Sequence, residues 1–158
     1  MSRLEGRKIL VVGAGTRKVD DPEAPAGNGR AIAVTAAIEG ATVACADIDV
    51  VAARETATQV RDVGGHAQVV VADVSDASAC TAMVAEAADL LEGLDGVVVN
   101  VGIGAGQWLG KTTVDQWDQV FDVNVRAHFL TCQAALPLMS EGGSIVLISS
   151  VAGLRPGS

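Results

Sequence analysis

The chain has 158 residues, of which 49% are apolar and 19% charged, so it can build one core and hardly two. The formal net charge of -8 argues against a surface that binds nucleic-acid phosphates. No apolar run approaches the roughly 18 residues that span a bilayer, and residues 1–6 lack the apolar stretch of a signal peptide. We therefore expect a cytoplasmic protein with no nucleic-acid or membrane partner. Its three widely spaced cysteines suggest no metal site.

A glycine-rich turn follows the first apolar run of the chain. Residues 9–12 are consecutive apolar residues, which is typical of a strand covered on both faces. Gly13 ends this run, and Gly27, Asn28 and Gly29 open an amphipathic helix. The unpaired N–H groups and the dipole of a helix start attract a phosphate, and glycines let it approach closely. We expect these four residues to bind the pyrophosphate of a dinucleotide.

The spacing of these glycines is unusual. The dinucleotide fingerprint G-x-G-x-x-G would begin at Gly13 and place its third glycine at position 18, where the chain has Lys18. One glycine at the strand end followed by G-x-G at the helix start fits instead, if residues 16–26 are largely an insertion. This segment contains charges and two prolines, which indicates a solvated loop. We predict that it forms a flap beside the pyrophosphate.

A second strand, predicted over residues 41–47, ends in Asp47, which is followed by Ile48. An acidic side chain at this place can accept both hydroxyls of an adenosine ribose and repels a 2′-phosphate. Asp47 and Ile48 are therefore predicted cofactor contacts that favour NAD and make NADP less probable. Arg17 and Lys18 argue the other way, because a basic residue in the glycine turn can accept a 2′-phosphate.

A third strand is predicted over residues 67–73 and ends in Asp73, with Val74 after it. The Asp73 carboxylate can accept from the adenine amino group while Val74 packs on the ring. A structural alternative stays open for both strand-end aspartates: Asp47, its neighbour Asp49, or Asp73 caps the helix that follows. These helices are predicted over residues 50–63 and 78–91.

A fourth apolar strand, residues 96–102, leads into a glycine-rich turn and contains Asn100, Val101 and Gly102. Strands that alternate with helices of about a dozen residues indicate right-handed βαβ units and a parallel sheet. Such a sheet binds ligands at the carboxyl ends of its strands. We expect an α/β fold, a Rossmann-type doubly wound parallel sheet of order 3-2-1-4-5, with the strand-end residues at one edge.

The rest of the chain adds a long helix and a fifth strand. A capping-box pattern starts at Thr113, and one helical stretch is predicted over residues 117–139. Asn124 lies among apolar residues of this stretch, so its amide needs a partner. Two glycines then break the chain, and residues 144–150 are predicted to form a strand that ends in two serines.

In this order, these residues resemble the short-chain dehydrogenase/reductase family along almost the whole chain. The resemblance implies an NAD(P)-dependent oxidoreductase that moves hydride between the nicotinamide and a small-molecule alcohol or ketone. Ser150, followed by Val-Ala-Gly, matches the family's catalytic serine, which hydrogen-bonds the substrate oxygen. Asn124 matches its catalytic asparagine, which supports a proton relay through water. The helix after Trp117 resembles the family's subunit-contact helix, which implies a homo-oligomer, a tetramer or a dimer.

The family's chemistry also needs a Tyr-x-x-x-Lys pair after the serine, with the tyrosine as general acid or base. The chain contains no tyrosine, and its lysines lie elsewhere. We expect residues 1–158 to be a single NAD(P)-binding domain that is incomplete at its C-terminus, with the pair beyond it. The alternative is a non-catalytic dinucleotide-binding protein or an inactive fragment of the same fold. A third hypothesis, a polyketide or fatty-acid ketoreductase domain, favours NADPH and disagrees with Asp47.

Overall fold

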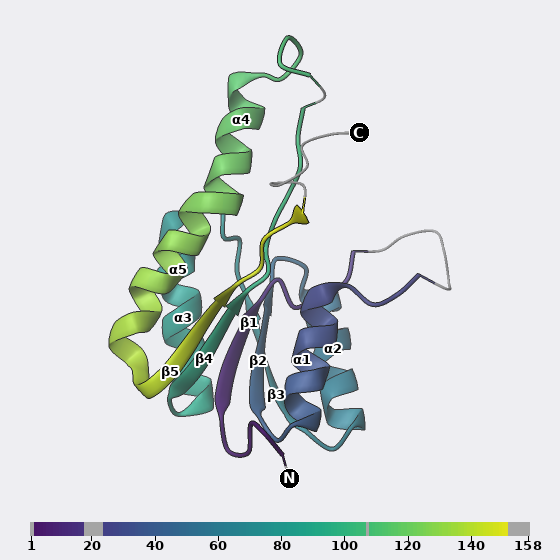
Figure 1. The fold of residues 1–158 in the computed structure, drawn as a ribbon, viewed down its shortest axis with the longest axis vertical. Helices are drawn as coiled ribbons and strands as arrows, with labels where there is room; N and C mark the ends of the chain where they lie inside the picture. Colours follow the sequence, from purple (N-terminus) through teal and green to yellow (C-terminus); the bar gives the residue numbers. More distant parts are fainter. Residues whose placement is uncertain (1, 18–23, 107, 152–158) are drawn as a thin grey trace.

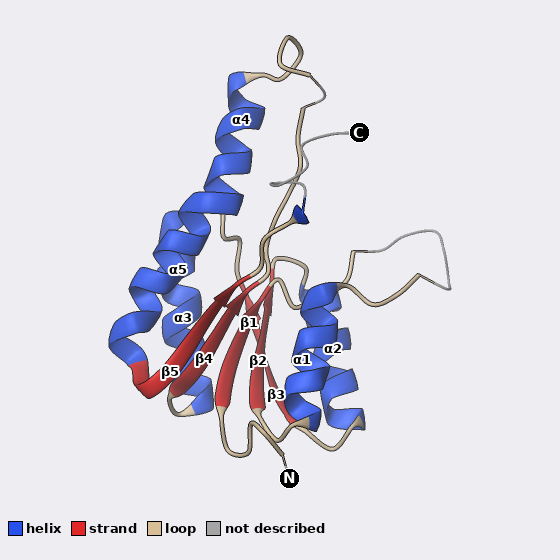
Figure 2. Cartoon of the chain, in the orientation of Figure 1, coloured by secondary structure: helices blue, strands red, loops and turns tan. Residues whose placement is uncertain are grey.

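The computed structural model describes residues 2–17, 24–106 and 108–151. These residues form a five-stranded parallel sheet in the order β3-β2-β1-β4-β5, with helices on both faces (Figures 1 and 2). The α/β class and the strand order predicted from the sequence are thereby confirmed. The strands are β1 Lys8–Val12, β2 Thr42–Asp47, β3 His66–Val71, β4 Leu94–Val99 and β5 Met139–Leu147. The helices are α1 Asn28–Ile38, α2 Val50–Asp62, α3 Ala77–Leu91, α4 Val114–Phe121 and α5 Ala127–Ala135.

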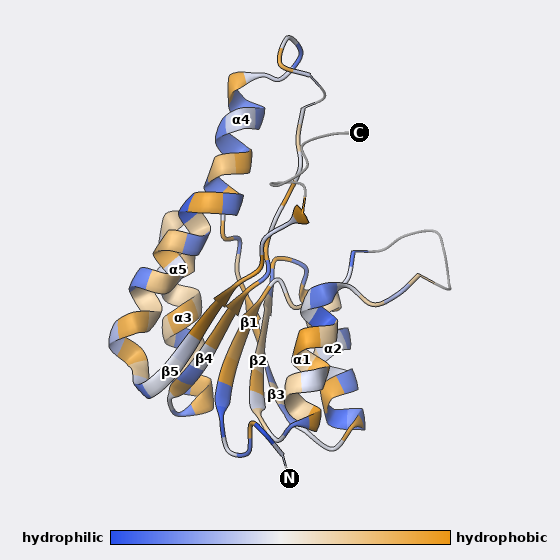
Figure 3. Cartoon of the chain, viewed as in Figure 1, coloured by the Kyte–Doolittle hydropathy of each residue, from blue (hydrophilic) through white to orange (hydrophobic). Residues whose placement is uncertain are grey.

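Strand β1 shows why the apolar runs of this chain are continuous. Leu10 and Val12 belong to a core that includes residues of α3 and α5, whereas Ile9 and Val11 belong to a core that includes residues of α1 and α2. A strand covered on both faces needs apolar side chains where it is covered, and Figure 3 accordingly shows the apolar colour over most of β1 and over the second half of β4. Cys45 of β2 lies in the second core, where burial raises the pKa of its thiol to about 12.

The strand register brings the ends of four strands to one edge of the sheet. Val12 pairs with Ala46 on one side and with Val99 on the other, and Asp47 pairs with Val71. The residues that follow each strand therefore leave the sheet together. β3 and β4 end before the predicted limits of 73 and 102, so Asp73 and Gly102 lie in loops rather than in strands.

The predicted limits of the fifth strand are wrong. β5 begins at Met139, directly after the 3₁₀ turn Leu136–Leu138, and ends at Leu147. The two glycines expected to break the chain lie inside β5, where the pairing with β4 shifts register between Leu94 and Gly96. Among the described residues β5 has β4 as its one neighbour, so this pairing alone accommodates the irregularity. Ser149 and Ser150 consequently follow the strand instead of ending it.

The stretch predicted as one long helix contains four helical segments, the last of which is the 3₁₀ turn Leu136–Leu138. A π-helical turn, Asp122–Arg126, joins α4 to α5 and contains Asn124. The capping box at Thr113 is confirmed, since its side chain accepts from the Gln116 N–H and the Gln116 side chain accepts from the Thr113 N–H. Figure 1 shows α4 reaching beyond the carboxyl ends of the strands. Neither this helix nor any other in the described ranges is long and apolar enough to cross a membrane.

Two aspartates cap helices in this structure. Asp49 caps α2 by accepting from two N–H groups of its first turn, and Asp76 caps α3 by accepting from the Ser78 N–H. Hydrogen bonds from the hydroxyl and the N–H of Ser78 lower the pKa of the Asp76 carboxyl. Of the three aspartates considered as caps, Asp49 is the one that caps a helix, and neither Asp47 nor Asp73 does so.

Candidate cofactor site

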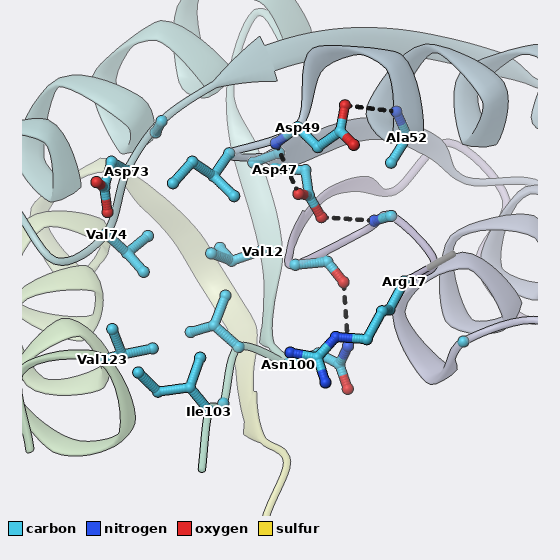
Figure 4. Close-up of a pocket in the computed structure, with 18 of the residues that line it drawn as sticks. Val12, Arg17, Asp47, Asp49, Ala52, Asp73, Val74, Asn100, Ile103 and Val123 are labelled. Atoms are coloured by element: carbon cyan, nitrogen blue, oxygen red, sulfur yellow. Dashed lines mark hydrogen bonds between the residues drawn. The ribbon is translucent and has the colours of Figure 1, made fainter. Parts of the chain in front are cut away.

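A cleft of about 810 Å³ opens at the carboxyl edge of the sheet (Figure 4). Its walls are the loops after β1, β2, β3 and β4, together with Gln119 and Val123 from the helix beside them. This volume lies within the range of roughly 300–1,000 Å³ that is typical of ligand pockets. Ten of the eleven residues predicted to contact a cofactor line it: Gly13, Gly27, Asn28, Asp47, Ile48, Asp73, Val74, Asn100, Val101 and Gly102.

Gly29, the eleventh, packs behind the cleft. A Cβ at this position would overlap the carbonyl oxygen of Gly13 and lie 2.8 Å from Nδ2 of Asn100. That amide donates to the Gly13 carbonyl at 3.0 Å, and Gly13 has a φ of 76°, which favours glycine. The first turn of α1 therefore lies directly against the glycine turn, where its unpaired N–H groups can meet an anion.

A side-chain hydrogen bond closes the base of the inserted segment. Oγ1 of Thr16 accepts from the N–H of Gly27 at 2.9 Å, so the two ends of the insertion meet beside the cleft. Residues 18–23, which make up most of the predicted flap, lie outside the described residues. Arg17 lines the cleft and is the single basic residue among its described lining residues. Sequence reasoning missed Thr16, because only the long-range contact reveals its role.

Asp47 joins the ends of β1 and β2. Its Oδ2 accepts from the N–H of Gly15 at 2.8 Å, and its Oδ1 accepts from the N–H of Asp49 at 3.0 Å (Figure 4). A Cβ at Gly15 would lie 2.7 Å from that Oδ2 and from Cβ of Ala52, so the turn and the carboxylate fit closely. Each carboxylate oxygen can accept more than one hydrogen bond, and Asp47 can still receive a ligand hydroxyl.

Asp73 and Val74 lie at the end of the cleft away from Arg17 (Figure 4). Oδ1 of Asp73 accepts from both the N–H and the hydroxyl of Ser75, at 2.9 and 2.7 Å, which holds the carboxylate in one orientation. Val74 is buried and packs in the core on the α3 side of the sheet. The pair thus places one held acceptor beside an apolar residue of the cleft wall.

A buried threonine supports the glycine turn. Thr56 of α2 is fully buried, donates from Oγ1 to the Ala14 carbonyl at 2.9 Å and accepts from Nε of Arg30 at 3.0 Å. Replacing Thr56 by valine keeps the shape and leaves both partners unsatisfied. We expect the free energy of unfolding in urea to fall by about 1–3 kcal/mol. Thr58→Val is the control: its exposed hydroxyl bonds only within α2, so an equal loss there would contradict the prediction.

The two predicted catalytic residues do not line the cleft. Oδ1 of Asn124 accepts from the N–H of Ile103 at 2.8 Å, and its Nδ2 donates to the Ile103 carbonyl at 2.9 Å. The amide that needed a partner thus binds the loop after β4. Ser150 is exposed and follows β5. The structure brings Asn124 to the back of the cleft wall and does not place Ser150 in that wall.

Removing the Asn124 amide should loosen this loop. In Asn124→Leu, both backbone groups of Ile103 lose their partner, and we expect the free energy of unfolding to fall by about 1–3 kcal/mol. The exposed amide of Gln133 on α5 offers the control, because Gln133→Leu removes a side chain in contact with solvent. Urea unfolding of both variants measures the two free energies of unfolding for comparison. Equal stability of the two variants would show that the bonds to Ile103 contribute nothing.

Residues 24–158 match the short chain dehydrogenase family. The chain belongs to this family. The 3beta-hydroxysteroid dehydrogenase of Mediterraneibacter gnavus is 35% identical over 157 residues, which cover 98% of this chain and 53% of that protein. The (3R)-3-hydroxyacyl-CoA dehydrogenase of Homo sapiens is 37% identical over 163 residues, which cover 96% and 59%. The chain thus spans little more than half the length of these curated relatives.

Solved structures of family members share the fold. A short chain dehydrogenase from Burkholderia cenocepacia, in complex with NADP, has a TM-score of 0.87 and 32% identity over 99% of this chain and 60% of its own. A short-chain dehydrogenase/reductase from Serratia marcescens has a TM-score of 0.85 and 30% identity over 95% and 58%. The cofactor of the first is NADP, so the expected preference for NAD gains no support from it.

Proposed function

We propose that the cleft of this short-chain dehydrogenase binds a nicotinamide dinucleotide, NAD or NADP, and that the chain forms the cofactor-binding part of an oxidoreductase. The observation that carries the proposal is the convergence of four strand ends on one cleft. Beside the glycine turn at Gly13, the start of α1 offers N–H groups to a pyrophosphate, Asp47 offers acceptors to a ribose, and Asp73 offers an acceptor to a purine.

The proposed substrate is a small-molecule alcohol or ketone. The nicotinamide, when bound, supplies or takes up the hydride, and the protein positions the substrate oxygen. Ser150 is the proposed hydrogen-bond donor to that oxygen. Asn124 is a positioning residue in this proposal, since both ends of its amide hold Ile103 in the cleft wall. The tyrosine that the family resemblance implies as general acid or base is not among these 158 residues.

Fluorescence titration of the chain with NADH and NADPH tests the proposed function. We expect saturable binding of at least one of them, with ADP-ribose competing for the same site. Asp73→Ala should weaken that binding, since the proposed purine acceptor is lost. Asp62→Ala, at the end of α2 and outside the residues that line the cleft, serves as the control. Failure of both dinucleotides to bind would refute the proposed function.

A second copy of this chain is the proposed partner of α4 and α5. Trp117, Phe121, Val125 and Phe129 recur at every fourth position and are between 45% and 61% exposed. The rings of Trp117 and Phe121 stack with centroids 4.6 Å apart. An apolar stripe of this kind is typical of helix-to-helix interfaces. Sedimentation equilibrium should show a homo-oligomer that Phe129→Glu dissociates, whereas Val63→Glu, also at an exposed apolar position, should leave it intact.

A further inference from the structure

The helix that carries Asn124 contacts the cofactor-binding loop at a second point. His128 lies one helical turn beyond Asn124, and its Nε2 is 3.0 Å from the carbonyl oxygen of Val101. A carbonyl oxygen only accepts hydrogen bonds, so the ring must carry a proton on Nε2 to make this contact. The ring is half-buried, and Val101 lines the cleft.

We infer that His128 is a positioning residue for the cofactor, acting through the peptide between Val101 and Gly102. This inference rests on the proposed function of the cleft. A trans peptide is planar, and its N–H points opposite to its C=O. Because His128 holds the Val101 carbonyl toward the helix, the N–H of Gly102 faces away from it. The direction of a backbone donor in the cleft wall is therefore set by a side chain behind it.

The loop after β4 needs the hydrogen bond from His128 at the peptide between Val101 and Gly102. Gly102 is exposed and has no side chain to fix its conformation, and its neighbours on both sides are held from the helix. His128 holds Val101, and Asn124 holds Ile103 through both its N–H and its carbonyl. Without the His128 bond, a glycine turn would keep only one of its two anchors. A turn that samples several conformations binds a ligand less tightly, because the ligand must then select one of them.

The same helical segment also contacts the adenine side of the cleft. Nη2 of Arg126, between Asn124 and His128, donates to the Ser75 carbonyl at 2.8 Å. Ser75 in turn holds the carboxylate of Asp73. Three alternate residues of one segment thus reach the loops after β3 and β4. His128 contributes the contact to the loop after β4 that sequence reasoning did not assign.

Three variants test the inference. His128→Leu removes the donor, His128→Gln keeps an N–H at the position of Nε2, and His66→Leu removes the other histidine, which is exposed at the start of β3. We expect His128→Leu to weaken NADH or NADPH binding about fivefold, the effect of one hydrogen bond. His128→Gln and His66→Leu should bind like the wild type within about twofold. A role in packing alone predicts instead that glutamine fails as leucine does, which would overturn the inference.

A measurement without cofactor separates this inference from the proposed function. The ¹⁵N resonances of the His128 ring report which nitrogen carries the proton, and we expect the proton on Nε2. The amide resonance of Gly102 should move in His128→Leu and return in His128→Gln. A ring protonated on Nδ1 alone would overturn the inference even where dinucleotides bind. If no dinucleotide binds to the wild type, the proposed function fails and the positioning role falls with it.

Discussion

Asp47→Ser is expected to change the ratio of the NADH and NADPH dissociation constants at least about tenfold in favour of NADPH. Asp47 lies at the end of β2 in the cleft wall, and a 2′-phosphate placed on a ribose there would meet its charge. Two unit charges about 4 Å apart near a protein surface interact by several kcal/mol, so removing one favours the phosphate strongly. NADH should bind more weakly, because its ribose hydroxyls lose a carboxylate acceptor.

Two companion variants show whether charge is the cause. Asp47→Asn removes the charge and keeps one oxygen that can accept from Gly15 or Asp49, while an NH2 group replaces the other acceptor, so it should shift the ratio in the same direction. Asp49→Asn keeps the cap of α2, since asparagine caps as well as aspartate, and should shift the ratio less. Arg17→Ala should weaken NADPH alone. Titration of each variant with both dinucleotides gives the ratios, and an unchanged ratio in Asp47→Ser would refute the assigned role.

The sheet could be predicted because its information is local. A strand such as β1 needs consecutive apolar residues when both of its faces are covered. At the carboxyl ends of the first four strands, where a parallel sheet binds its ligands, the sequence has a glycine, an aspartate or an asparagine. A parallel sheet in the predicted strand order then places Gly13, Asp47 and Asn100 at the carboxyl edge of the sheet. The capping box at Thr113 is likewise complete within four residues, and the structure has both of its hydrogen bonds.

The errors occur where distant residues decide the structure. β5 starts at Met139 because it pairs with Leu94 of β4, across two glycines that would locally break a strand. The π-helical turn at Asp122–Arg126 has no sequence signal of its own, and it places Asn124 against Ile103, 21 residues away. His128 has no sequence signal for the same reason, since its partner is the carbonyl of Val101, 27 residues away. A side chain whose partner is a backbone carbonyl leaves no pattern in the sequence.

Gly29→Ala is expected to have the largest effect on the cleft. The added methyl group would overlap the Gly13 carbonyl and crowd the Asn100 amide, and both are backbone or closely held atoms that cannot move alone. The first turn of α1 must then shift away from the glycine turn. We expect the free energy of unfolding to fall by about 1–3 kcal/mol. Dinucleotide affinity should fall at least about tenfold, because the helix N–H groups leave the anion they would bind.

Two other glycines give graded controls for this substitution. A Cβ at Gly104 would meet no atom within 4 Å, so Gly104→Ala should change neither stability nor binding. A Cβ at Gly27 would lie 3.2 Å from Oγ1 of Thr16 and 3.3 Å from the Gly15 carbonyl oxygen and from Cα of Thr16, contacts much less severe than those at Gly29, so Gly27→Ala should fall between the two. Urea unfolding gives the free energy of unfolding of the three variants, and titration gives their dinucleotide affinity. If Gly29→Ala bound as Gly104→Ala does, α1 would not need to touch the glycine turn, and the anion site at its start would have to be abandoned.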